Sequence, residues 1–126
     1  MLDAIRSLDY VVVLCDDIET TRRFYADVLS FPIYRDWDDW IEFQVGATLL
    51  TLRERGRPED GQSPPSGTTG VQLAFRVPPP DVDRCYEALC DHDVEIVDEP
   101  RTREYGHRTL FFRDPEGNLL EIYADV

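Results

Sequence analysis

Apolar and polar residues follow two patterns along this chain: alternation over short stretches, and helical spacing over two longer ones. Residues Leu8 to Cys15 form a valine-rich run that predicts a strand. Residues 17–29 carry apolar side chains at helical spacing after Asp16 and Asp17, which suit a helix N-cap, so they predict an amphipathic helix. Three short strands are predicted to follow, at residues 33–36, 40–45 and 48–53.

The second half of the chain repeats this order of patterns. A strand is predicted at residues 71–77. A helix is predicted after Asp81, because apolar side chains fall at i, i+3, i+4, i+7 and i+8 from Val82 to Cys90. We expect a loop from Asp98 to Gly106. The remaining strands are predicted at residues 94–97, 107–113 and 117–123.

The chain is therefore an internal repeat with a period of about sixty residues, and each half has the order strand, helix, strand, strand, strand. We predict an α+β fold of two βαβββ modules in tandem, with helices outside curved mixed sheets that surround a cavity. The expected single domain, residues 1–126, contains a first module at 7–53, a polar linker loop at 54–69 and a second module at 70–124. The length of the loop would also allow a flap over a site.

The end of the chain contains the residue on which the functional interpretation depends. Asp-Pro-Glu-Gly at 114–117 predicts a tight turn, with Pro115 early in the turn and Gly117 at its positive-φ position. In the strand that follows, alternation places Glu121 on the same face as Leu119 and Tyr123. A buried, unpaired carboxylate is costly, so Glu121 is expected to face solvent, a polar cavity or a cation.

Charge and composition narrow the range of partners. The chain has 26 acidic residues against 13 basic residues, all of them arginine, and its formal net charge is −13. Such a surface repels nucleic acid and anionic membranes, and we prefer a solvated acidic surface to a cation-binding function as its explanation. With no apolar run long enough to cross a bilayer and no signal-peptide pattern, a cytoplasmic location is expected. The three cysteines suggest neither a disulfide framework nor a zinc ribbon, and we expect all of them to be buried or half-buried, at Cys15, Cys85 and Cys90.

Several of these stretches resemble vicinal-oxygen-chelate proteins, the family that includes glyoxalase I, bleomycin-resistance proteins and extradiol dioxygenases. The similarity runs from about residue 8 to residue 123, which is nearly the whole chain. The resemblance agrees with the predicted βαβββ repeat, but it says little about activity, because proteins of this fold have many different functions. The matching stretches are residues 8–13, 17–19, 24–25, 28–32, 72–77 and the closing signature 112–122.

The resemblance implies a metal-ligand pattern that this chain matches only in part. In metal-using members, a His or Gln on the first strand of each half and a Glu on the last strand hold the metal. Gln72 and Glu121 stand at two of these positions, whereas Tyr10 and Thr51 stand at the other two. A neutral phenol, with an ordinary pKa of about 10, is a poor ligand for Ni, Zn, Fe or Mn. The candidate metal set is therefore Gln72 and Glu121 alone, and the cofactor is either a divalent metal or none.

Other candidate ligand-binding residues are aromatic or imidazole side chains. His107 opens a predicted strand near the region where the family binds substrate, although capping of the strand would explain it equally well. Trp40 and Tyr123, with Trp37 and Phe43, could form an aromatic wall, but aromatic residues at this density belong more often to a core. His92 ends a helix between two aspartates and is expected at the surface.

Three functional hypotheses follow. The first, which we favour, is a protein that binds a small organic ligand in the cavity with a degenerate metal site, as bleomycin-resistance members do. The second is a metal-dependent lyase/isomerase or oxygenase in which Glu121 and Gln72 hold the metal and Glu121 moves a proton. The third is a non-catalytic module in which Glu121 only hydrogen-bonds Tyr10. The resemblance also implies a homodimer, and leaves open whether the cavity forms within one chain or between two.

Overall fold

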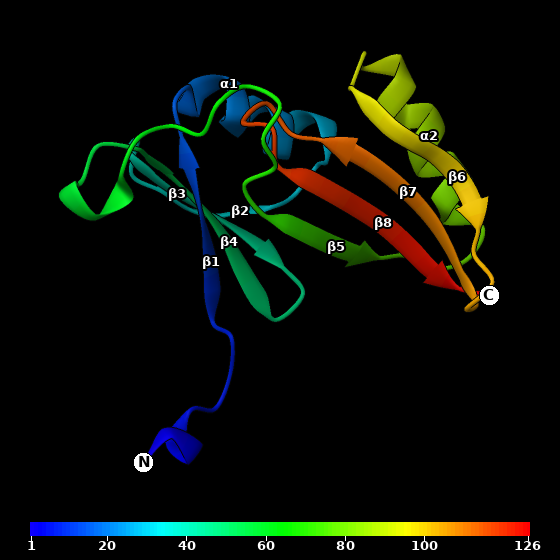
Figure 1. Ribbon diagram of the computed structural model, residues 1–126, viewed down its shortest axis with the longest axis horizontal. Helices are drawn as coiled ribbons and strands as arrows, with labels where there is room; N and C mark the ends of the chain where they lie inside the picture. The colour runs from blue at the N-terminus through cyan, green and yellow to red at the C-terminus, as the bar shows by residue number, and fades with distance from the viewer. The chain divides into compact units, whose positions relative to one another are not determined.

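The first sheet contains four strands in the order β1-β4-β3-β2. The computed structural model describes residues 1–126. Strand β1 pairs with β4 in parallel, whereas β4 with β3 and β3 with β2 are antiparallel. The elements of this half, coloured blue to green in Figure 1, are η1 (Leu2–Ala4), β1 (Tyr10–Cys15), α1 (Ile18–Arg23), η2 (Phe24–Val28), β2 (Ile33–Asp36), β3 (Trp40–Val45), β4 (Thr48–Glu54) and η3 (Pro58–Asp60).

The second sheet repeats that arrangement with the order β5-β8-β7-β6. Strand β5 is parallel to β8, and the other two pairings are antiparallel. The predicted α+β fold of two tandem βαβββ modules is confirmed. The elements, coloured green to red in Figure 1, are β5 (Gln72–Arg76), α2 (Asp81–Asp91), β6 (Ile96–Thr102), β7 (His107–Arg113) and β8 (Leu119–Asp125).

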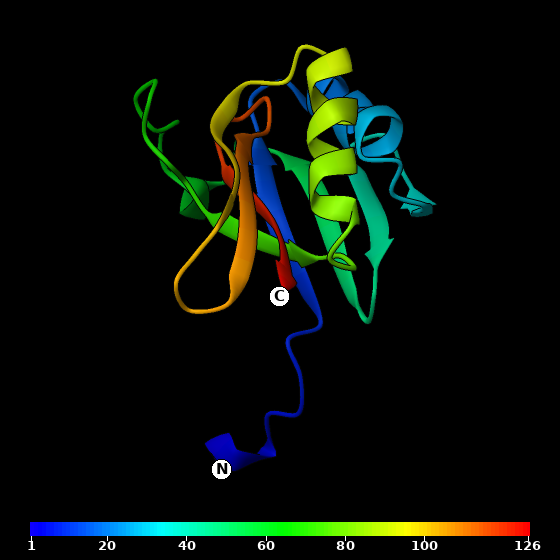
Figure 2. The ribbon, with the colours of Figure 1, turned by 90° about the vertical axis from the view of Figure 1, so that its right-hand side faces the viewer.

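The chain divides into two compact units, Met1–Ser63 and Pro64–Val126, and each contains one complete sheet. Residues before β1 extend away from their own sheet in both views (Figure 1, Figure 2). None of the helices is both long enough and apolar enough to cross a bilayer.

Each sheet has one face under its helix, and that face is the core. Helix α1 packs on β4, and α2 packs on β6, β7 and β8. Period-2 alternation sends every second side chain to this face, as the pattern of the sequence predicts. The core side chains from the strands are apolar: Val13, Cys15, Ile41, Phe43, Leu50, Leu52, Leu110, Phe112, Leu120, Ile122 and Ala124. The opposite, free faces hold the candidate functional residues.

The helix expected at residues 17–29 is confirmed, with one difference in its geometry. Asp17 caps its N-terminus by accepting a hydrogen bond from the backbone of Thr20. After Arg23 the helix widens to π geometry, and the Leu29 amide donates to the Phe24 carbonyl. Phe24 and Tyr25 are both buried at this point, so the wider turn coincides with the aromatic part of the helix.

Two expectations in the second half are wrong. The loop expected from Asp98 to Gly106 is shorter, because β6 continues to Thr102. Pro100 is tolerated inside β6 because this is an edge strand whose pairing with β7 is irregular between Asp98 and Arg101. Cys90 is exposed rather than buried, since it lies at the solvent edge of the stripe on α2.

The turn between β7 and β8 forms as predicted and is fixed by side chains. The Gly117 amide donates to the Asp114 carbonyl, and Gly117 has φ of 84°. The Asp114 carboxylate accepts from the backbone amides of Glu116 and Asn118. Asn118 in turn accepts from the Val71 amide, which ties the turn to the start of β5.

Candidate functional site

The two units have the same strand register, so their free faces can be compared position by position. In the first unit, Tyr10 is paired with Leu49 and Val12 with Thr51. In the second, Gln72 is paired with Leu119 and Ala74 with Glu121. Tyr10 therefore occupies the position of Gln72, and Thr51 the position of Glu121.

Gln72 and Glu121 lie together on the free face of the second sheet. The Gln72 amide Nε2 donates to Glu121 Oε1 at 3.4 Å. Gln72 is exposed and Glu121 is half-buried. Parallel pairing of β5 with β8 brings these side chains together, because alternation points both away from α2.

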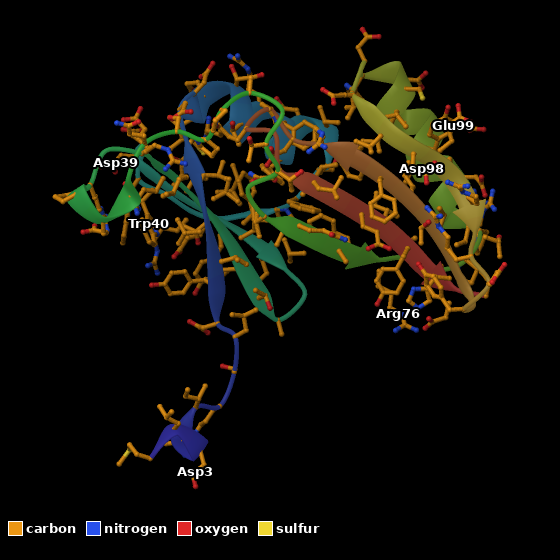
Figure 3. The ribbon with its side chains drawn as sticks, in the orientation of Figure 1. Asp3, Asp39, Trp40, Arg76, Asp98 and Glu99 are labelled. Atoms are coloured by element: carbon orange, nitrogen blue, oxygen red, sulfur yellow. The ribbon has the colours of Figure 1, made fainter.

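The same face carries a stacked pair of rings towards the end of β8. The His107 and Tyr123 rings are 4.8 Å apart with an interplanar angle of 29°. His107 Nε2 lies 3.1 Å from Asp125 Oδ1, and the Arg76 guanidinium forms an ion pair with the other oxygen of Asp125. Figure 3 shows Arg76 beside the C-terminal end of β8. These four charged or aromatic side chains thus lie on the same face of the sheet as Glu121.

In the first unit, the free face brings together Tyr10, Trp40 and Thr51. The Tyr10 and Trp40 rings meet edge to face at 6.1 Å. Tyr10 is paired with Leu49 and Trp40 with Arg53, so rings that meet must lean across Thr51, which stands between these two positions of β4. Thr51 is accordingly fully buried although it is on the face without a helix.

The sequence interpretation missed Glu42, which shares this face. Glu42 is the cross-strand partner of Thr51 and is only 7% exposed. Its Oε2 accepts a hydrogen bond from Trp40 Nε1 at 3.1 Å, and its Oε1 lies 3.7 Å from Nε of Arg35. The alternation argument that singled out Glu121 applies equally to Glu42 in the predicted strand 40–45.

Arg53 occupies the position that Tyr123 has in the second unit. Its guanidinium forms two hydrogen bonds of 2.8 Å to the carboxylate of Asp60, in the segment after β4. This hydrogen bonding, together with the backbone amides of Gly56 and Arg57, holds the pKa of the Asp60 carboxyl far below its usual range. The same contact raises the pKa of Arg53. The first unit therefore places an ion pair where the second unit has a ring stack.

The remaining aromatic and histidine expectations divide between core and surface. Phe43 is fully buried beside Tyr25 on the helix-covered face, so it belongs to the core, which was the preferred expectation, and not to an aromatic wall. Trp37 is exposed, and its ring lies 4.7 Å from the Arg35 guanidinium. His92 is exposed at the end of α2, as expected.

The donor set does not fit a metal centre within either unit. No group of three His, Cys, Asp or Glu side chains comes together in residues 1–126. In the second unit the Gln72 amide nitrogen donates to Glu121, so these two side chains pair with each other instead of presenting two oxygens to an ion. Tyr10 adds only a neutral phenol to the first unit.

Comparison with known proteins places the chain in a family. The model of the glyoxalase/bleomycin resistance protein/dioxygenase superfamily matches residues 7–122. Protein YraH of Bacillus subtilis is 32% identical over 88% of this chain and 92% of its own length. A protein from Staphylococcus saprophyticus named metallothiol transferase FosB is 28% identical over 95% of this chain and 78% of its own.

Solved structures agree with this assignment. The crystal structure of virulence protein STM3117 from Salmonella typhimurium is 29% identical, with a TM-score of 0.72. The match covers 97% of this chain and 98% of that protein. The family model spans both sheets and includes every candidate residue except Tyr123. The chain belongs to the glyoxalase/bleomycin resistance protein/dioxygenase superfamily.

Proposed function

We propose that this chain binds a small organic ligand on the free face of its second sheet and that its metal site is degenerate. The observation that carries the proposal is the pairing of Gln72 with Glu121 at 3.4 Å, in a chain that brings no three His, Cys, Asp or Glu side chains together as a metal site. An amide and a carboxylate side by side offer both donors and acceptors to a polar ligand. The stacked rings of His107 and Tyr123 add a flat aromatic surface on the same face.

A thermal-shift screen of aromatic and cationic compounds tests this proposal. We expect at least one compound to raise the melting temperature, and we expect Glu121→Gln to remove that shift. Glu87→Gln is the matched control, because Glu87 is exposed on α2 and its loss changes the net charge equally. A screen in which no compound shifts the melting temperature would overturn the proposal.

The alternative is a metal-dependent enzyme that uses Glu121 and Gln72, as a lyase/isomerase, an oxygenase or a transferase. The relative named metallothiol transferase FosB supports it, because the similarity to that protein covers 95% of this chain. The test is a titration of protein purified without chelator with Ni, Zn, Mn and Fe(II). Stoichiometric binding that Glu121→Ala abolishes would favour the enzyme. Absence of binding at micromolar metal would leave the organic ligand as the function.

We infer further that the chain forms a homodimer. Large apolar side chains stand exposed before β1, at Met1, Leu2, Ile5 and Leu8. Such a group of apolar side chains is normally covered by another surface, and cyclic dimers are the commonest assemblies. Light scattering after size exclusion is expected to give twice the mass of 14.6 kDa, whereas deletion of residues 1–8 should weaken the dimer.

A further inference from the structure

The first unit contains two buried oxygen atoms that lack hydrogen-bond partners. They are Oε1 of Glu42 and Oγ1 of Thr51. The two residues are direct cross-strand partners, so their side chains are neighbours on the free face. The Glu42 side chain is 9% exposed and Thr51 is fully buried. A buried acceptor without a donor is costly, so this pair of oxygens is suited to an N–H donor that the unit itself does not supply.

The nearest positive charge belongs to Arg35, and it only partly satisfies Glu42. Its Nε lies 3.7 Å from Glu42 Oε1, which is beyond hydrogen-bond distance. Its guanidinium lies 4.7 Å from the ring of Trp37 and 5.5 Å from that of Tyr34. The Arg35 side chain is 43% exposed on the edge strand β2. A planar cation thus rests among aromatic rings beside a carboxylate, without donating to that carboxylate.

We propose that Glu42, Thr51, Trp37 and Trp40 form a binding site for an organic cation that carries N–H donors on a flat group, such as an amidinium or arylammonium. The Arg35 guanidinium occupies part of this site when no ligand is bound. The inference rests on the proposed function because it names a class of ligand, but all of its residues lie in Met1–Ser63 and it does not require Gln72 or Glu121.

Each part of the ligand has a partner in this site. An N–H⁺ group that displaces Arg35 can donate to Glu42 Oε1, and a charge-assisted hydrogen bond of this kind is stronger than the present contact. The Thr51 hydroxyl can accept a second N–H. The face of Trp37, which is 60% exposed, can accept the flat cation that Arg35 now provides. The net charge of −13 also attracts cations to this surface.

To reach the Thr51 hydroxyl, the ligand must also part the rings of Tyr10 and Trp40, which now cover it. Arg35 must move first, and its position allows this. Its contacts to Trp37 and Tyr34 are with exposed rings, and all of β2 is exposed. A ligand therefore competes with Arg35, and removal of the guanidinium should strengthen binding. A purely structural role for the Arg35–Glu42 ion pair gives no such competition.

Intrinsic fluorescence provides a direct assay, because the chain has two tryptophans and both are in this site. Figure 3 shows Trp40 at the start of β3. Trp37 belongs to the turn between β2 and β3. The probe is benzamidine, and benzamide, which has a similar shape and no charge, is the matched control ligand. We expect a saturable change with benzamidine and none with benzamide.

Variants separate this site from the proposed ligand face of the second unit. Glu42→Gln and Thr51→Val should each weaken benzamidine, with Glu42→Gln losing at least about tenfold in affinity, whereas Arg35→Gln should tighten it. Thr51→Val keeps the shape of the side chain, so it gives a reading even where Glu42→Gln disturbs folding. Glu54→Gln, which removes an exposed carboxylate from the other face of β4, is the charge-matched control.

Three outcomes overturn the inference: equal signals from benzamidine and benzamide, unchanged affinity in both Glu42→Gln and Thr51→Val, or an affinity in Arg35→Gln that is no higher than in the wild type. Loss of benzamidine binding in Glu121→Gln alone would overturn it while supporting the proposed function. Ligand binding that depends on Glu121, together with absent benzamidine binding, would leave the proposed function standing without this site.

Discussion

The two units share a strand register and differ in where each places its carboxylate. In the second unit Glu121 is on β8 and its cross-strand partner on β7 is Phe111. In the first unit the carboxylate is on β3, at Glu42, and the matching position on β4 is Thr51. The carboxylate thus stands on neighbouring strands in the two units, although the strand order of the two sheets is the same. This difference shows that the two faces of each sheet have separate roles. The helix-covered face determines the fold of the module, and the free face carries its chemically active side chains.

The helix-covered faces are the part that the two units have in common. Phe43 is paired with Leu50, and Phe112 with Leu120, at matching positions, and all four side chains are buried. The free faces differ at almost every matching position. Tyr10 corresponds to Gln72, and Arg53, which binds Asp60, corresponds to Tyr123, which stacks on His107. Ligand specificity should therefore be alterable at the exposed positions of the free face, such as Tyr10 and Gln72, at little cost to folding.

The largest predicted effect tests whether the helix-covered faces are equivalent. Phe43→Ala and Phe112→Ala should each lower the free energy of unfolding by about 4 kcal/mol, because each leaves a cavity in a fully buried position. Urea denaturation followed by circular dichroism measures both values. The exposed Tyr105→Ala is the control and should have little effect. Losses that differ severalfold between the two phenylalanines would contradict the equivalence.

The second prediction tests the displaced carboxylate. Thr51→Glu copies the position of Glu121 into the first unit, where it sets a second carboxylate against the buried Glu42. We expect it to cost about 3 kcal/mol more than Thr51→Gln, which has nearly the same size and no charge. Urea unfolding at neutral pH gives the difference.

A double variant completes this test. Glu42→Gln combined with Thr51→Glu should recover most of the charge-dependent loss, because only one carboxylate then remains on the face. Equal stability of Thr51→Glu and Thr51→Gln would show that the first unit tolerates both acids, and the expected repulsion between Glu42 and a carboxylate at position 51 would be wrong.

The sequence predicted the frame because the frame depends on alternation and on turn residues. Gly117 and Pro115 predicted the last hairpin, and the apolar stripe on residues 82–90 predicted α2. The end of β6 was missed because a proline is read as a strand breaker, although an unpaired edge accepts it. The π turn after Arg23 was missed because it is only five residues long. Over so short a stretch, the spacing of apolar residues hardly differs between an α-helix and a π-helix.

The candidate site was predictable where the repeat supplied the comparison. Matching the two halves identified Gln72, Glu121, Tyr10 and Thr51 as equivalent positions. Glu42 was missed because its importance depends on the β3–β4 register and not on the repeat. The two-residue turn at Gly46 and Ala47 fixes that register, so the pairing of Glu42 with Thr51 was available from the sequence. The contacts of Arg35 could not be predicted from alternation, since a bulge in β2 sets its position.

The third prediction compares the two hairpins. The β7–β8 turn depends on Asp114 and Asn118, whereas the β3–β4 turn depends on Gly46 with φ of 57° and open space around it. Asn118→Ala should cost about 2 kcal/mol, because the amide of Val71 loses its acceptor and Asp114 loses a donor. Gly46→Ala should cost about 1 kcal/mol through backbone strain alone. Urea unfolding of both variants measures the contrast, and a larger loss from Gly46→Ala would reverse it.

The smallest predicted effect concerns the ion pair of Arg53 with Asp60, which stands where the second unit has the stacked rings of His107 and Tyr123. The pKa of Asp60 is lowered on folding from its usual value of 3.8, chiefly by its hydrogen bonds to Arg53. A carboxyl whose pKa is lower in the folded state stabilises fully above its unfolded pKa, and that contribution is lost as the pH falls through the folded value. Asp60→Asn should therefore be less stable than the wild type at neutral pH, and the difference should shrink as the pH falls below 3.8. Urea midpoints across this range give the measurement, and Glu59→Gln is the neighbouring control. A constant difference at every pH would show that the ionised carboxylate of Asp60 is not the source of the effect, and the contrast with the pair Tyr123–His107 would then lie in loop geometry rather than in charge.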